Sequence, residues 1–368
     1  MVTVLDKPER VKEVDRSDML DDLVKTPNYC RDAIKRAKQV SMPEKVNPKH
    51  IVVVGMGGSA IGGEILHGWL RDTLPIPIEV CRDYTLPAYV NKDTLVLVNS
   101  YSGNTEETLT AFLAAIRRKC TVTAVTSGGQ LGSFCKKLQV PYMIIPEGLQ
   151  PRAAIPYLFF PLPVLMEKMG IISDIDDELE EAIQTIERVV KANAPNVPTK
   201  NNSAKQLATE LIDTIPVVYG FRHYGSVAQR LKTQFNENSK VPSKYEVFSE
   251  LNHNETVGYE APESLTKKLS IILIRDPQEP PEIRSRIETT TKLVFSRANK
   301  VLEIMATGKG KLAKMFSVLC TGDFVSVYLA ILQNKDPTPV NIIDRVKSEL
   351  AKKTRMKERL EAELAKLK

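Results

Sequence analysis

Short hydroxyl side chains gather in residues 100–107, whose sequence is Ser-Tyr-Ser-Gly-Asn-Thr-Glu-Glu. The apolar run 94–99 before this serine-rich turn predicts a buried strand, and the residues after it have a helical pattern. Helix N-termini favour anions because their first N–H groups lack partners and the helix dipole is positive there. Ser100, Ser102 and Thr105 add compact hydroxyl donors. The serine-rich turn therefore predicts a phosphate site.

A second turn of small residues, the glycine-rich turn 55–63, follows the β-branched run 50–54. Such a turn can bind a pyrophosphate, but Ala60 breaks the G-x-G-x-x-G spacing of dinucleotide sites. Small residues required only for tight packing are the alternative explanation. Two such turns at the carboxyl ends of parallel strands bracket the crevice where these sheets bind ligands. We therefore expect Gly58 and Ser59 to contribute to a monophosphate site.

Strand patterns alternate with helical patterns along most of the chain, which predicts parallel sheets with crossover helices. A Pro- and Asn-rich stretch, 193–202, predicts a linker between two such sheets. The predicted strands of the first sheet are 50–54, 78–82, 95–99, 121–126 and 142–145, and those of the second are 216–219, 245–248, 271–274 and 301–305.

Composition limits the classes of function. The chain has 368 residues, 42% hydrophobic and 26% charged, which is typical of a globular protein with two domains. The net charge of +6 is spread along the chain, which favours a small anionic ligand over nucleic acid. The five cysteines have no CxxC or metal-ligand spacing, which predicts free thiols in a reducing compartment. We expect no membrane-spanning run and no secretory signal, and hence a cytoplasmic protein.

Several separated motifs together resemble the sugar isomerase (SIS) fold and, within it, the bifunctional phosphoglucose/phosphomannose isomerases of archaea and some bacteria. They are Gly57-Gly58-Ser59, Ser100-x-Ser102-Gly103-Asn104-Thr105-Glu106-Glu107-Thr108, Gly148-Leu-Gln-Pro151-Arg152-Ala-Ala, Asn236-Glu237-Asn238-Ser239-Lys240 and Asn252-His253-Asn254-Glu255. The resemblance implies an α/β protein with two SIS subdomains, each a five-stranded parallel sheet flanked by helices in a doubly wound, flavodoxin-like order. It also implies a homodimer whose active sites are shared between subunits.

The resemblance covers residues 40–350 and sets the expected domain ranges. These are an N-terminal helical segment 1–40, a phosphate-binding subdomain 41–192, a subdomain 203–350 with the catalytic Glu and His, and a charged helical extension 351–368. We expect the helical extension to be solvated.

The activity implied is metal-independent aldose–ketose isomerisation, which needs no cofactor. Glucose 6-phosphate and mannose 6-phosphate differ only at C2, and loss of the C2 proton from either gives an enediolate that leads to fructose 6-phosphate. The protein must hold the phosphate, open the ring, move a proton between C2 and C1, and stabilise the enediolate charge.

The family motifs give each role a residue in this chain. Glu237 matches the base, whose pKa partial burial would raise toward neutrality. His253 matches a histidine that the neighbouring subunit supplies for ring opening, and Asn252 and Asn254 could orient its ring. Lys347 matches a lysine that assists ring opening. Arg152 matches a guanidinium that binds the substrate and stabilises the enediolate.

One specificity position stays open. The family uses a small hydroxyl residue near the C-terminus to leave room for the mannose epimer. Thr338 is a candidate for that position, which the resemblance does not settle.

Three other functions share features with this sequence. A non-catalytic SIS protein that senses a sugar phosphate is the main alternative, although residues 1–45 have no helix-turn-helix pattern. A glucosamine-phosphate synthase-like isomerase is disfavoured because no N-terminal cysteine or glutaminase domain is present. A zinc-dependent mannose isomerase is disfavoured because no His/Glu metal cluster is visible in the sequence.

Overall fold

The computed structural model describes residues 3–367 and divides into two compact units. The first-sheet unit comprises Asn28–Asp176 and Val340–Lys368, and the second-sheet unit comprises Met1–Pro27 and Asp177–Pro339. This grouping differs from the expected domain ranges because the N-terminal residues pack with the second sheet and the C-terminal helices with the first. The family-based domain boundaries stay a prediction.

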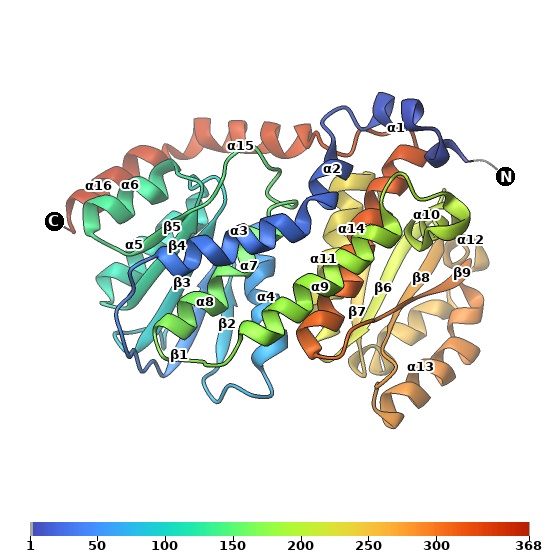
Figure 1. Cartoon of the computed structure of the whole chain (residues 1–368), viewed down its shortest axis with the longest axis horizontal. Coiled ribbons are helices and arrows are strands. Elements are labelled where there is room, and N and C mark those ends of the chain that lie inside the picture. Colours follow the sequence, from blue (N-terminus) through green and yellow to red (C-terminus); the bar gives the residue numbers. More distant parts are fainter. Residues whose placement is uncertain (1–2, 368) are drawn as a thin grey trace. The chain divides into compact units, whose positions relative to one another are not determined.

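The first-sheet unit is built on five parallel strands in the order β2-β1-β3-β4-β5 (Figure 1). The order reverses between β1 and β3, which is the switch point at which doubly wound sheets bind ligands. The strands are β1 (His50–Val54), β2 (Ile78–Cys81), β3 (Thr94–Ser100), β4 (Thr121–Thr126) and β5 (Tyr142–Ile144). The flanking helices are α3 (Thr26–Gln39), α4 (Gly58–Leu70), α5 (Glu106–Arg117), α6 (Gly129–Leu138), α7 (Ile155–Phe159) and α8 (Pro161–Lys168).

The second sheet has four parallel strands among the described residues, in the order β7-β6-β8-β9. The doubly wound α/β class is confirmed, but the fifth strand implied for this sheet is not found there. The strands are β6 (Ile215–Phe221), β7 (Lys244–Phe248), β8 (Leu269–Arg275) and β9 (Lys300–Met305). The helices of this unit are α1 (Pro8–Val14), α2 (Met19–Val24), α9 (Asp176–Asn193), α10 (Ser203–Glu210), α11 (Tyr224–Gln234), α12 (Glu263–Thr266), α13 (Pro281–Leu293) and α14 (Lys311–Leu332).

Helix α14 is the apolar core helix of the second-sheet unit. It has the length and composition of a membrane span, so the expectation that no run approaches one is wrong. However, 89% of its most apolar window is buried inside the structure. Side chains around its whole circumference are buried, which is typical of a helix in a protein core.

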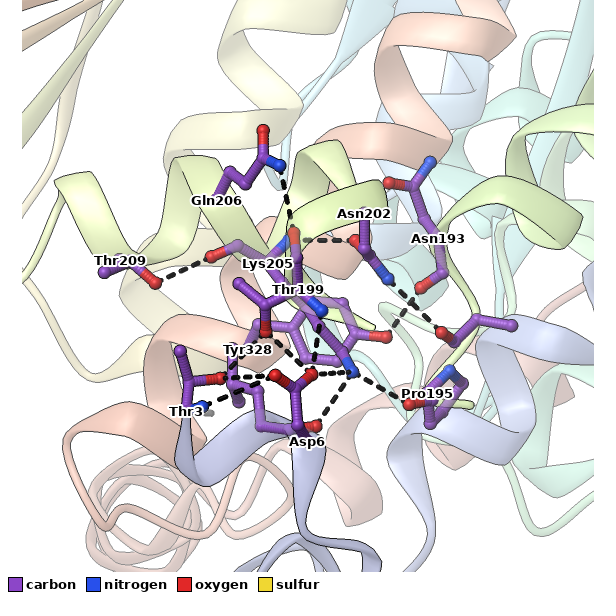
Figure 2. A network of polar contacts seen from close by, with 12 residues as sticks. Thr3, Asp6, Asn193, Pro195, Thr199, Asn202, Lys205, Gln206, Thr209 and Tyr328 are labelled. Atoms are coloured by element: carbon purple, nitrogen blue, oxygen red, sulfur yellow. Dashed lines mark hydrogen bonds and ion pairs between the residues drawn. The ribbon is translucent and has the colours of Figure 1, made fainter. Parts of the chain in front are cut away.

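Polar contacts hold the predicted linker, residues 193–202, in a fixed position (Figure 2). Lys205 in α10 is fully buried and donates to the carbonyl oxygens of Leu5 and Pro195, each at 2.8 Å. Asp6 accepts hydrogen bonds from the backbone N–H and the hydroxyl of Thr199, both at 2.8 Å. Residues 3–6 and the linker therefore form one ordered part of the second-sheet unit.

The C-terminal extension forms α15 (Asn341–Thr354) and α16 (Met356–Ala365). Every residue of α15 lies outside the core, as expected for a solvated helix. Helix α16 differs, because Leu360 and Leu364 are 3% and 4% exposed and join a core cluster that includes Phe112 of α5. Two leucines spaced by four residues lie on one helix face, so α16 docks while most of its other side chains face solvent.

Candidate functional site

Two strand-to-helix turns flank the switch point of the first sheet. The glycine-rich turn joins β1 to α4, and the serine-rich turn joins β3 to α5. Gly57 is the N-cap of α4, and Thr105 is the N-cap of α5 without a capping hydrogen bond from its hydroxyl. The N-cap residues thus provide no side-chain acceptor to either helix, although Ser59 and Ala60 in the first turn of α4 donate their N–H groups to the carbonyls of Met56 and Gly57. This arrangement suits an anion.

The predicted phosphate ligands divide into two groups. Ser59 is 6% exposed, and its Oγ accepts the backbone N–H of Tyr101 at 3.1 Å. Ser100 is also buried, and its hydroxyl donates to Thr105 Oγ1 at 3.4 Å. Ser102 is exposed and Thr105 is half-buried. Ser59 and Ser100 therefore hold the two turns in shape, whereas Ser102 and Thr105 present hydroxyls to the surface.

Gly58 brings a third segment to these turns. A side-chain carbon at Gly58 would lie 2.8 Å from the carbonyl oxygen of Pro151 and 3.2 Å from the backbone nitrogen of Arg152. Only glycine allows this approach. The first turn of α4 therefore lies directly against the segment that carries Arg152.

Arg152 itself is 2% exposed, and its Nη1 lies 3.4 Å from Gln150 Oε1. Burial in protein strengthens the field of a guanidinium relative to water. The phosphate candidates and Arg152 all belong to the first-sheet unit, and the structure brings them together there.

Tyr101 and Asn104 connect the turns, and reasoning from the sequence missed both roles. The Tyr101 hydroxyl donates to the carbonyl of Pro146 at 2.9 Å and accepts the N–H of Leu149 at 2.8 Å, which fixes the segment before Arg152. Asn104 Oδ1 accepts the N–H of Gln130 in the first turn of α6 at 3.0 Å. Both residues lie inside the serine-rich turn. Their position next to its three hydroxyl residues is the feature of the sequence that could have indicated these roles.

Glu237 lies on a π-helix, Phe235–Ser239, that continues α11. Its side chain is half-buried, which agrees with the burial expected of the base. Lys240 directly follows the π-helix. Its Nζ donates to the carbonyl of Glu237 and to the carbonyl of Pro337 at 2.9 Å. The segment with Thr338 therefore lies beside the turn that carries Glu237, within the second-sheet unit.

His253 ends a 3₁₀ helix, Glu250–His253, and is exposed. The expected role of its asparagine neighbours is wrong. Asn252 donates to Thr290 Oγ1 at 2.7 Å, and Asn254 donates to Glu250 Oε1 at 2.9 Å while its oxygen accepts the N–H of Glu255. These amides therefore bond to parts of the surrounding loop and to α13, and none of these bonds involves the imidazole of His253.

Lys347 lies on the exposed helix α15 of the first-sheet unit. Glu237 and His253 belong to the second-sheet unit instead. The predicted residues thus come from both units, with the phosphate candidates, Arg152 and Lys347 on one and the base and histidine on the other.

The carboxyl edge of the second sheet is occupied by the chain's own side chains. Asp276, just after β8, accepts from Tyr224 Oη at 2.6 Å and from Lys314 Nζ at 2.9 Å. Burial works against the charge of Asp276, but these hydrogen bonds outweigh it, so its pKa lies below the usual value. The equivalent of the first sheet's anion site is therefore filled by an internal carboxylate.

Acidic and sulfur ligands do not gather elsewhere in the part of the chain that the structure describes. Among residues 3–367, no group of three or more His, Cys, Asp and Glu side chains is placed to hold a metal ion. All five cysteines are free thiols.

Comparisons with known proteins identify the family and the fold of the chain. The family described as "Bacterial phospho-glucose isomerase C-terminal SIS domain" matches residues 200–350. The bifunctional phosphoglucose/phosphomannose isomerase of Caldicellulosiruptor bescii is 41% identical over 90% of this chain and 99% of its own length. The protein of the same name from Aquifex aeolicus is 36% identical over 83% of this chain and 91% of its own length.

A solved structure supports the fold. A glucose-6-phosphate isomerase like protein from Thermus thermophilus superposes with a TM-score of 0.62 at 20% identity, covering 90% of this chain and 96% of its own. With the two parallel sheets and the near-complete match to the curated relatives, the chain is an isomerase that belongs to the bifunctional phosphoglucose/phosphomannose isomerase family.

Proposed function

We propose that this chain interconverts glucose 6-phosphate and mannose 6-phosphate with fructose 6-phosphate by proton transfer through a cis-enediolate. The observation that carries the proposal is the pair of helix N-termini, α4 and α5, whose N-cap residues supply no capping side chain on either side of the switch point. A phosphate there would accept the N–H of Gly58 at the start of α4, N–H groups of the first turn of α5, and hydroxyl donors from Ser102 and Thr105.

The phosphate anchors the inert end of the sugar, so the reaction takes place at C1 and C2. Glu237 takes the proton from C2 and returns it to C1, and the hydroxyl proton on the C2 oxygen moves to the C1 oxygen. Electrons move within the substrate, so this step needs no redox partner. The buried guanidinium of Arg152 stabilises the negative charge that develops on the enediolate oxygens.

Ring opening is assigned to His253 and Lys347. The exposure of His253 fits a residue that reaches the active site of the partner subunit in a homodimer. Lys347 is likewise exposed on α15 and available to a substrate. The place of Thr338 beside the π-helix supports a role in admitting the mannose epimer, since Lys240 joins its neighbour Pro337 to Glu237.

The test is the coupled conversion of both aldose phosphates to and from fructose 6-phosphate by Glu237→Gln. Removal of the base should lower kcat by about 10²–10⁴-fold. Glu288→Gln, an exposed glutamate of α13, is the matched control and should keep wild-type kcat. A chelator should leave the rate unchanged.

Two results would contradict the proposal. Unchanged activity in Glu237→Gln would remove the assigned base. Tight binding of hexose 6-phosphates by the wild-type chain without turnover would instead identify a sugar-phosphate sensor.

A further inference from the structure

We propose that Asp323 and Ser326 of α14 are positioning residues that hold the π-helix and thereby aim Glu237 at the substrate carbon. This inference rests on the proposed role of Glu237 as the base. Asp323 and Ser326 stand 86 and 89 residues beyond Glu237 in the chain.

Glu237, the proposed base, lies on an unusual type of helix. A π-helix has one more residue in each hydrogen-bonded turn than an α-helix, is rare, and occurs often at functional sites. Successive residues of an α-helix are separated by about 100° around its axis, so a return to α-helical geometry would turn the Glu237 side chain away. Contacts that hold the π-helix therefore also set the direction of Glu237.

Ser326 holds the C-terminal side of the π-helix with two hydrogen bonds. Its Oγ accepts from Asn238 Nδ2 at 2.9 Å, and its carbonyl oxygen accepts from Ser239 Oγ at 2.6 Å. All three residues are at most 1% exposed. The Ser326 hydroxyl donates its own proton to the carbonyl of Asp323 at 2.7 Å, which leaves its lone pairs directed at Asn238.

Asp323 holds the N-terminal side. Its two carboxylate oxygens accept from Arg230 Nη2 at 2.7 Å and from Gln234 Nε2 at 2.9 Å. Arg230, Gln234 and Asn238 recur every four residues, so α14 bonds one continuous face of α11 and the π-helix. Buried and bonded on both sides of Glu237, this network tolerates little displacement.

Gly322 allows the two helices to meet closely enough for these bonds. A side-chain carbon at this position would lie 2.4 Å from Leu231 Cγ. On the other side of the turn, Lys240 ties the carbonyl of Glu237 to that of Pro337. The backbone at Glu237 is thus held on one side by the bond between Ser326 and Asn238 and on the other by Lys240. The Glu237 side chain itself is half-buried.

The test compares Ser326→Ala with Ser317→Ala in the full chain. Ser317 is a matched control because it is also a buried serine of α14 whose hydroxyl donates to the carbonyl three residues earlier, at 2.7 Å. Its oxygen accepts from Thr307 N, so it makes no contact with the π-helix through that bond. Ser326→Ala should lower kcat by about 10–100-fold because the base is misplaced, with KM for hexose phosphates unchanged.

Ser317→Ala should keep wild-type kcat although it lowers the melting temperature to a similar extent. Asn238→Ala removes the other end of the same bond and should reproduce the loss of kcat. The double variant Ser326→Ala/Asn238→Ala should then be no slower than either single variant, because one interaction is lost in all three.

The outcomes separate the two levels of the proposal. If Glu237→Gln is inactive while Ser326→Ala and Asn238→Ala match the kcat of Ser317→Ala, positioning by α14 is overturned and the base assignment stands. If Glu237→Gln retains wild-type kcat, the base assignment fails and the positioning role falls with it.

Discussion

At the scale of single residues, Asp6 and Lys205 show how a buried charge is made tolerable. The Lys205 ammonium lies 3.3 Å from Asp6 Oδ1 and 5.6 Å above the centre of the Tyr328 ring, in addition to its two carbonyl partners (Figure 2). Burial alone would raise the pKa of Asp6, but hydrogen bonds from Thr199, Thr3 and Lys205 lower it to about 2. A buried lysine without such partners would cost several kcal/mol.

Asp6 should therefore contribute to stability in a pH-dependent way. Its folded-state pKa lies below its unfolded value of 3.8, so its contribution is present above about pH 4 and is lost as the pH falls toward 2. Asp6→Asn should lower the free energy of unfolding at pH 7, and the gap to wild type should shrink as the pH falls below about 4 and close only below the folded-state pKa, at about pH 1. Urea unfolding at both pH values measures this. An equal gap at both would show that Asp6 acts without its charge.

The residue types of the site were predictable, but most of their hydrogen bonds were not. The hydroxyls of the serine-rich turn were correctly expected at a strand-to-helix junction, since the apolar run before them is unmistakable. That Ser59 is engaged by Tyr101 depends on two strands lying side by side, which local pattern does not reveal. The role of Asn252 beside His253 could not be predicted because its partner Thr290 is distant in sequence. Asn254, in contrast, bonds to its near neighbours Glu250 and Glu255.

At the scale of elements, α16 is a terminal helix held by a narrow apolar stripe. Leu360 and Leu364 enter the core beside α5, and Glu363 pairs with Arg117 of that helix. The charged composition of this segment predicts a solvated helix. Two leucines in a charged sequence are only a weak indication that the helix docks on the core. Burial against a preformed apolar surface decides its position.

Leu360→Ala should therefore loosen α16. The loss of a buried leucine costs about 2–4 kcal/mol, which should appear as faster hydrogen exchange of the α16 amides. Leu350→Ala is the control, because Leu350 is 46% exposed on α15 and its loss should change exchange by less than about 0.5 kcal/mol. Equal effects of the two substitutions would mean that α16 is not docked by this stripe.

The positions of most strands could be predicted from the pattern of apolar residues in the sequence. The nine strands of the described residues lie at the predicted apolar or alternating runs, and their ends differ from the predicted ones by at most two residues. Helices α7 and α8 follow each other closely but are separate, because Pro161 lacks the N–H that would continue the helix hydrogen bonds. The π-helix could not be predicted, since its partner Ser326 lies 88 residues from Asn238.

At the scale of the whole molecule, the phosphate candidates and the base candidate belong to different units of one chain. The sequence predicts that the first sheet binds the phosphate and that the second-sheet subdomain carries the catalytic Glu and His. The internal ion pair at the carboxyl edge of the second sheet is consistent with phosphate binding by the first sheet alone. In the described part of the second-sheet unit, Asp276 and Lys314 are paired at that edge, where the first sheet has its predicted phosphate site.

A homodimer with shared sites should show complementation. Glu237→Gln and His253→Ala should each be nearly inactive alone. In a twofold-symmetric dimer, mixing equal amounts with exchange of subunits should restore about a quarter of wild-type activity, because half of the dimers carry one intact site. Failure to restore activity after proven exchange would place both residues of a site on one chain.

The most direct test of the central claim is the fate of the C2 proton. Fructose 6-phosphate is converted in heavy water, and deuterium at C2 of the glucose and mannose 6-phosphate products is measured by NMR. Proton transfer through an enediolate with Glu237 as base predicts deuterium at C2 of both epimers, at a rate that Glu237→Gln lowers by about 10²–10⁴-fold. Label that enters C2 as fast in Glu237→Gln as in wild type, or aldoses that form at the wild-type rate in Glu237→Gln, would contradict it.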